Sequence, residues 1–198
     1  MGVKFTYANI VTLSRFFMAP LFLIFMLSGT ASGTVTALII FVVAALTDWL
    51  DGFLARKYGE VTDHGIFLDP LADKVLTTSA FVALYILDVM SAWMLIIIIA
   101  RDFGTTAMRS IADDKGMTMK TSYVAKVKTF LQMVVIIIAV LCIAVHKSDP
   151  DGPLGFYARF MLVFPIISSG LLLVTLLSVY SLIHYIIVNR RLFSRGST

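Results

Sequence analysis

The stretch FFMAPLFLIFMLSGTASGTVTALIIFVVAAL, residues 16–46, decides the fold because it contains no charged residue. At about 1.5 Å of rise per residue, one helix over this stretch would be longer than the ~30 Å hydrocarbon core of a bilayer. The chain therefore has to turn within it. The glycines and small polar residues of Gly29–Gly33 break helical periodicity and tolerate turn geometry. The stretch predicts two membrane-spanning helices joined near Gly29.

The rest of the chain continues this pattern. It has 198 residues, of which 59% are hydrophobic and 14% are charged, a composition that excludes an ordinary soluble domain. No cleavable signal peptide is expected, because hydrophobic segments recur and no small-residue cleavage site follows the first. An isolated strand cannot satisfy its backbone in lipid, so each segment is predicted to be helical. We predict an all-α integral membrane protein with a single domain over residues 1–198 and six transmembrane helices, near residues 8–28, 34–55, 69–87, 91–111, 123–145 and 158–188, the last one kinked at Pro165.

The basic residues predict the orientation in the membrane. Six crossings place both termini on one side, and with cytoplasmic termini 14 of the 16 Lys and Arg residues fall on the cytoplasmic side. Lys147 and Arg159 are the two on the other side. We therefore expect the cytoplasmic membrane as location, with the net charge of +4 facing lipid headgroups. Nucleic acid is not an expected partner, because the chain has no basic soluble domain with interleaved aromatic residues.

Two carboxylates share one predicted helix face with two very small residues. Asp48, Asp51, Gly52 and Ala55 stand at i, i+3, i+4 and i+7, which is one stripe of a helix. Small residues on such a stripe let a neighbouring helix or a ligand approach closely. Ionisable groups inside membrane spans are costly and usually mark a functional site. The stripe is therefore a candidate site.

Asp69 and Asp73 repeat the arrangement at i and i+4 in the next predicted span. Asp69 is followed by Pro70, which is typical of a helix N-cap and first helical position. By this interpretation the preceding Asp63 and His64 belong to a solvated loop.

Four like charges brought together repel one another unless a cation holds them. Carboxylates select hard cations such as Mg²⁺, Mn²⁺ or Ca²⁺, which in turn commonly bind phosphate oxygens. The residues leave a plainer alternative open, in which Asp48 and Asp51 pair with Arg56 and Lys57 as a structural ion network. The four carboxylates taken together instead favour one or two divalent ions held between two helix ends, with Arg56 in reach of a phosphate.

The stretch resembles the complete signature of the CDP-alcohol phosphotransferase family, D-x2-D-G-x2-A-R-x8-G-x3-D-x3-D. The resemblance covers essentially the whole chain, and it implies a Mg²⁺-dependent (or Mn²⁺-dependent) displacement, with two ions, in which an acceptor hydroxyl attacks a CDP-alcohol and CMP leaves. The metal ligands it implies are Asp48, Asp51, Asp69 and Asp73, of which Asp69 and Asp73 are also the catalytic candidates, with Asp73 favoured as general base. It further implies a homodimer, and a nucleotide and pyrophosphate pocket formed by Gly52, Ala55, Arg56, Gly65, Asn9 and Thr12, in which Gly65 allows a close turn.

Two basic clusters bear on the acceptor. Arg101 and Arg109 lie about two turns apart in one predicted span, and Lys126 and Lys128 begin the next. Topology and headgroup contact would account for any single one of them, but four cations near a carboxylate site favour an acceptor with its own phosphate. The segments Arg101-Asp-Phe and Lys126-x-Lys-Thr, with Asn9–Arg15, also resemble the family branch that makes phosphatidylglycerol phosphate, although Ala125 replaces an expected glycine.

The expected substrates are therefore CDP-diacylglycerol and sn-glycerol 3-phosphate, with inositol phosphate as an alternative acceptor and an ion or proton transporter as a remote alternative. Thr12 and Arg15 could reach the site from the first span. An interfacial cap with an Arg15 side chain that snorkels to the surface explains them equally well. Cys142 is expected to be a buried structural thiol.

Overall fold

The computed structural model describes residues 7–58, 63–114 and 123–194, and it describes side chains within residues 14–47, 74–112 and 123–189. These parts of the chain are entirely helical apart from short turns, which confirms the predicted all-α class. The helices are α1 (Tyr7–Met26), α2 (Ala31–Tyr58), α3 (Asp63–Ile86), α4 (Ala92–Asp114), α5 (Tyr123–Ser148), α6 (Pro153–Val163) and α7 (Ile166–Ser194).

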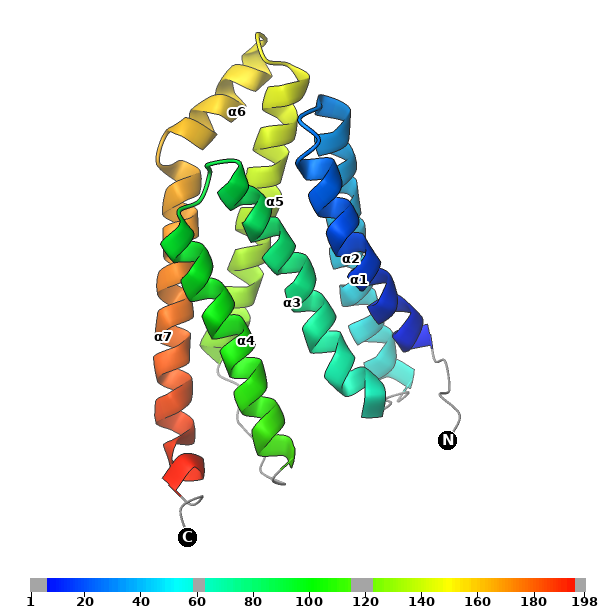
Figure 1. Cartoon of the computed structure of the whole chain (residues 1–198), viewed down its shortest axis with the longest axis vertical. Coiled ribbons are helices and arrows are strands. Elements are labelled where there is room, and N and C mark those ends of the chain that lie inside the picture. Colours follow the sequence, from blue (N-terminus) through cyan, green and yellow to red (C-terminus); the bar gives the residue numbers. More distant parts are fainter. Residues whose placement is uncertain (1–6, 59–62, 115–122, 195–198) are drawn as a thin grey trace.

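Six long helices run up and down a single bundle, and α6 lies across one end of it (Figure 1). We call the end where α1 begins and α7 ends the terminal end; α2 and α4 also end there, and α3 and α5 begin there. The opposite end holds α6 and the turns at residues 27–30, 87–91 and 149–152. Since α5 packs against α2, α3, α6 and α7, it is the central helix. Its Ile136 is fully buried, as are Phe22 of α1 and Leu171 of α7.

Large apolar side chains cover the outside of the bundle. Phe17, Ile96, Phe130 and Leu176, each from a different long helix, are between 57% and 70% exposed. A soluble protein rarely exposes apolar surface on this scale, whereas lipid would cover it. Among the residues that the structure describes, α5 and residues 166–189 of α7 are long and apolar enough to cross a membrane. The exterior is that of a membrane protein.

The predicted turn in the charge-free stretch is confirmed. α1 ends at Met26 and α2 begins at Ala31, with Gly29 between them at φ 76°. A residue with a Cβ rarely adopts this left-handed conformation, so glycine is suited to the position. The turn is shorter than expected, and Gly33 already belongs to α2.

The prediction of one continuous span over residues 158–188 was wrong. The structure has two helices there, α6 and α7, separated at Phe164 and Pro165. Proline clashes with a helical conformation of the residue before it and lacks an N–H to donate. Phe164 is accordingly extended, at φ −71° and ψ 154°. Pro165 therefore ends one helix rather than kinking a longer one.

The predicted start of the third span was also wrong. α3 begins at Asp63, so Asp63 and His64 are helical rather than loop residues, and Asp69 and Pro70 lie inside the helix rather than at its cap. Proline inside a membrane helix is tolerated when surrounding groups satisfy the backbone it frees. Gly65 lies in the first turn of α3, not in the close turn expected for it.

Gly155 fixes how α6 folds back on α5. A Cβ on Gly155 would lie 1.6 Å from the Asp149 backbone oxygen, which cannot move without breaking the turn. We expect Gly155→Ala to lower the free energy of unfolding by about 1–3 kcal/mol, measured by thermal unfolding in detergent. Gly104→Ala is the control, since a Cβ there meets nothing within 4 Å and alanine favours a helix by up to about 1 kcal/mol. Equal stability of the two variants would contradict the close approach.

Candidate functional site

The predicted carboxylate residues lie toward the terminal end of the bundle. Asp48 and Asp51 are in the last three turns of α2, and Asp69 and Asp73 are in the first three turns of α3. Their side chains fall outside the described residues, so their role as metal ligands stays a prediction. The same holds for the predicted nucleotide residues, which lie in α1 (Asn9 and Thr12), α2 (Gly52, Ala55 and Arg56) and α3 (Gly65).

The donor chemistry of this set fits a divalent cation, because four carboxylates offer only the hard oxygen ligands that Mg²⁺ and Mn²⁺ prefer. Within the described side chains no group of three or more His, Cys, Asp or Glu residues comes together. The four predicted ligands are not among those side chains.

Arg15 is a residue for which the structure decides between two interpretations. It lies in the half of α1 toward the terminal end and is only 2% exposed. A snorkelling side chain would have its guanidinium group at the surface, so that interpretation was wrong. Arg15 belongs to the interior, where α1 packs against both carboxylate-bearing helices, α2 and α3.

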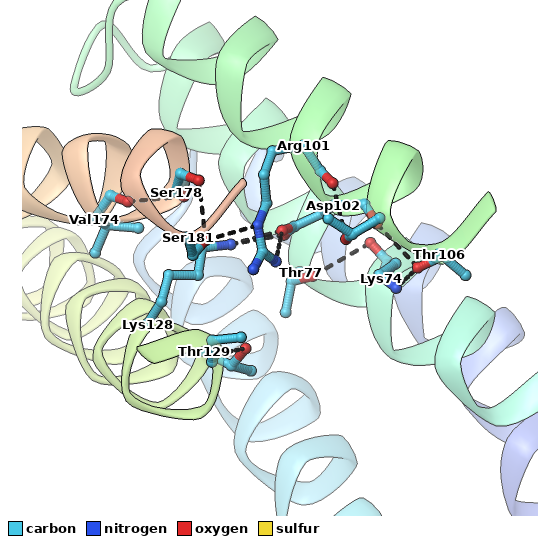
Figure 2. Close-up of polar contacts among 12 residues, drawn as sticks. Lys74, Thr77, Arg101, Asp102, Thr106, Lys128, Thr129, Val174, Ser178 and Ser181 are labelled. Carbon is cyan, nitrogen blue, oxygen red and sulfur yellow. Dashed lines mark hydrogen bonds and ion pairs between the residues drawn. The ribbon is translucent and has the colours of Figure 1, made fainter. Parts of the chain in front are cut away.

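A buried polar network joins four helices and involves two of the predicted acceptor-binding residues (Figure 2). At its centre is Asp102 of α4. Lys128 of α5 donates to both Asp102 carboxylate oxygens, at 2.7 and 3.0 Å, and Arg101 Nη1 donates to Oδ1 at 2.9 Å. Arg101 and Asp102 are each 8% exposed and Lys128 is 1% exposed. We call the following residues the polar network: Lys74, Arg101, Asp102, Thr106, Lys128 and Ser181.

The outer members of the network connect it to α3 and α7. Arg101 Nε donates to Ser181 Oγ of α7 at 3.0 Å, and the Ser181 hydroxyl in turn donates to its own helix at the Ser178 carbonyl. On the other side, Lys74 Nζ of α3 donates to Thr106 Oγ1, which donates to the Asp102 carbonyl at 2.9 Å. Lys74 directly follows Asp73 in the chain. The network therefore begins one residue from a predicted catalytic carboxylate.

The network is net positive and keeps hydrogen-bond donors in reserve. Lys74, Arg101 and Lys128 carry three positive charges against one on Asp102. A guanidinium has five N–H donors and an ammonium has three, so the two hydrogen bonds of Arg101 and the two of Lys128 leave both side chains with donors for an anion. Asp102 holds both cations in one place, which pre-organises them for a ligand with two or more oxygens.

The other two predicted acceptor residues lie apart from this centre. Arg109 is about two turns beyond Arg101 on α4, toward the terminal end, and is exposed. Lys126 precedes Lys128 by two residues and is exposed where Lys128 is buried, since residues two apart do not share a helix face. The structure thus brings Arg101 and Lys128 together and leaves Arg109 and Lys126 at the surface.

Sequence reasoning missed the residues that organise this centre. Asp102 belongs to the Arg101-Asp-Phe segment, but its position as partner of both cations depends on α3 and α7, which pack against both α4 and α5. Ser181 sits in an apolar helix with no local signal. Gln132, one turn after Lys128, is 3% exposed, and its Oε1 has no hydrogen-bond partner among the described residues. That oxygen is a second polar atom on the Lys128 face of α5.

Ser181→Ala tests the link between α7 and the network. The change leaves the buried Arg101 Nε without its acceptor, and an unsatisfied buried donor costs about 1–3 kcal/mol. We expect the melting temperature to fall by about 2–10 °C for a chain of this size. Ser178→Ala is the matched control, because the Ser178 hydroxyl is equally buried but donates only to the Val174 carbonyl of its own helix. An equal loss in both variants would contradict the role given to Ser181.

The fold and the network define an all-helical membrane protein with a buried cationic centre that joins α3, α4, α5 and α7. Comparison with known proteins makes this class specific. A family model described as CDP-alcohol phosphatidyltransferase matches residues 5–188. The chain belongs to this family.

Two relatives are similar over most of the chain. A protein of Bacillus subtilis (strain 168) named CDP-diacylglycerol--glycerol-3-phosphate 3-phosphatidyltransferase is 39% identical over 181 residues, which cover 84% of this chain and 92% of the relative. A protein of the same name from Escherichia coli (strain K12) is 40% identical over 139 residues, 67% of this chain and 75% of the relative. The family resemblance seen in the signature is thereby confirmed.

Proposed function

We propose that this protein transfers the phosphatidyl group of CDP-diacylglycerol to sn-glycerol 3-phosphate, giving phosphatidylglycerol phosphate and CMP. The observation that carries this function is the sequence identity of 39% and 40% to relatives that are named for that reaction. The buried pair Arg101 and Lys128 supports it independently, because an acceptor with a phosphate needs cations of its own. A carrier of cations or protons would have no use for a phosphate-binding centre of this kind.

Asp48, Asp51, Asp69 and Asp73 are proposed to hold two Mg²⁺ or Mn²⁺ ions, which when bound neutralise the charge that develops on the transferred phosphorus and the CMP leaving group. Gly52 and Ala55 leave room for the nucleotide, and Arg56 contacts its pyrophosphate. Asp73 takes or orients the proton of the attacking hydroxyl. Its neighbour Lys74 donates a hydrogen bond to Thr106 of α4, which fixes this turn of α3 relative to Asp102 and Arg101 on the same helix.

The polar network is proposed to bind the acceptor phosphate. Arg101 and Lys128 supply the buried donors, and Asp102 positions them. The exposed Arg109 and Lys126 attract the acceptor from solution and contact it at the entrance. Holding the phosphate in this way directs the 1-hydroxyl of the acceptor toward the carboxylates.

In the membrane we propose six crossings, by α1 to α5 and α7, with both termini and the terminal end of the bundle on the cytoplasmic side. Residues 1–198 then form one domain whose site meets the soluble acceptor and the lipid nucleotide at the same surface. The distribution of Lys and Arg supports this orientation. We also propose a homodimer, which light scattering of the detergent-solubilised protein tests.

Purified protein with CDP-diacylglycerol, Mg²⁺ and a radiolabelled acceptor tests the reaction. We expect CMP release and labelled lipid with sn-glycerol 3-phosphate, and neither product when Mg²⁺ is chelated. Inositol phosphate is the competing acceptor in a parallel reaction. Labelling by inositol phosphate alone would overturn the acceptor and keep the family reaction, whereas no CMP with either acceptor would overturn the enzyme.

A further inference from the structure

A cavity of about 310 Å³ lies at the opposite end of the bundle, far from the carboxylate residues. Three separate segments form it: the turn between α3 and α4, the last turns of α5, and α6. Its volume is within the range of sites that bind small ligands. The proposed reaction leaves this cavity without a role. We call it the α6 cavity.

The wall of the α6 cavity carries both basic residues that the topology assigns to this side of the membrane. Lys147 of α5 and Arg159 of α6 line it, together with His146 and one carboxylate, Asp88. Among the described residues neither Lys147 nor Arg159 makes an ion pair, and Nδ1 of His146 is buried without a hydrogen-bond partner. Asp149 and Asp151 of the neighbouring turn are not part of the lining. Two cations against one carboxylate make the lining net positive, and Lys147 and Arg159 offer uncommitted donors.

The remaining wall is apolar and continues onto a surface suited to lipid. Ile143, Leu162 and Val163 line the cavity beside the polar residues. On α6, Phe156 and Tyr157 are 65% and 66% exposed, and tyrosine is enriched at the boundary between hydrocarbon and headgroups. At 11 residues α6 is too short to cross a bilayer. A helix of this length and composition suits the membrane–water interface. The α6 cavity lies between this helix, the end of α5 and the turn between α3 and α4.

We propose that the α6 cavity binds the phosphate of an anionic phospholipid from the leaflet opposite the catalytic site. Lys147 and Arg159 contact the phosphate oxygens, with His146 beside them in the lining. The acyl chains leave along Leu162 and Val163 into the bilayer. A bound lipid would tie α6 to the ends of α3 and α5. A free phosphate would satisfy the same cations but would leave the apolar wall uncovered, and for this reason we assign the site to a lipid.

Photocrosslinking at a single position tests the proposal. The full chain, with p-benzoylphenylalanine in place of Val163, is reconstituted into vesicles of equal parts phosphatidylglycerol and phosphatidylcholine, irradiated and analysed by mass spectrometry. Val163 is 73% exposed and lines the cavity, so the change is tolerated and reports locally. We expect phosphatidylglycerol to be crosslinked about fivefold over phosphatidylcholine, since the lining has a net charge of about one.

The same probe at Phe156, which is exposed on α6 outside the lining, is the positional control and should capture the two lipids about equally. Lys147→Gln combined with Arg159→Gln should bring the ratio of phosphatidylglycerol to phosphatidylcholine crosslinked at Val163 to about one. Arg159→Lys keeps the charge and should retain most of the preference. Circular dichroism confirms that each variant is folded. Equal capture at Val163 in the unaltered background, or a ratio that survives the double change, would overturn the proposal. Loss of the ratio on adding inorganic phosphate would assign the site to free phosphate instead.

Discussion

Asp51→Asn is expected to lower kcat/KM by about a thousandfold or more, because Asp51 is a proposed metal ligand and losing such a ligand removes several kcal/mol of charge stabilisation from the transition state. The asparagine keeps the size of the side chain but not its negative charge, so Mg²⁺ is held less tightly. CMP release at increasing Mg²⁺ measures the effect.

Two measurements keep this result specific. Asp151→Asn removes the same charge from the exposed turn before α6, far from the site, and should leave turnover unchanged. Helix content and melting temperature of the Asp51 variant should match the unaltered protein, since the loss is chemical rather than structural. A variant that keeps more than about a tenth of its activity, a loss of under 1.4 kcal/mol, would remove Asp51 from the ligand set.

Lys128→Met is the second change with a large expected effect. It should lower both the stability of the fold and the affinity for the acceptor. Methionine preserves the volume but leaves the buried Asp102 carboxylate with Arg101 as its remaining charged partner in the network. Breaking a buried ion pair from one side costs about 3–5 kcal/mol. The KM for sn-glycerol 3-phosphate should rise about ten- to a hundredfold, since hydrogen bonds to a charged group contribute about 1.5–3 kcal/mol.

A double variant separates the two effects. Lys128→Met with Asp102→Asn removes the buried carboxylate and leaves an amide oxygen that can still accept from Arg101 Nη1, so part of the lost stability should return, while the acceptor KM stays high and the KM for CDP-diacylglycerol changes little. Lys126→Met is the matched control for the lysine, because its exposed side chain should alter stability by no more than about 0.5 kcal/mol. Recovery of the acceptor KM in the double variant would mean that Lys128 is structural and does not bind the acceptor.

Local patterns were sufficient to predict most of the fold. The charge-free stretch required a turn, and Gly29 lies in that turn at a positive φ. Predictions failed where a proline had two possible roles. Pro70 lies within α3, where it was expected to begin a helix, and Pro165 separates two helices, where it was expected to kink one. Which role a proline takes depends on whether packing compensates for the hydrogen bond it cannot donate, and spacing does not contain that information.

The sequence by itself determined the family, the carboxylate signature and the membrane character of this protein, because each depends on the order and spacing of residues close in the chain. The tertiary structure alone decided which cations meet. Lys126 and Lys128 are alike in sequence, yet one is exposed and the other is buried against Asp102, 26 residues earlier. The physical reason is that a buried charge persists only where a distant helix supplies its partner, and that pairing exists only once α4, α5 and α7 have packed.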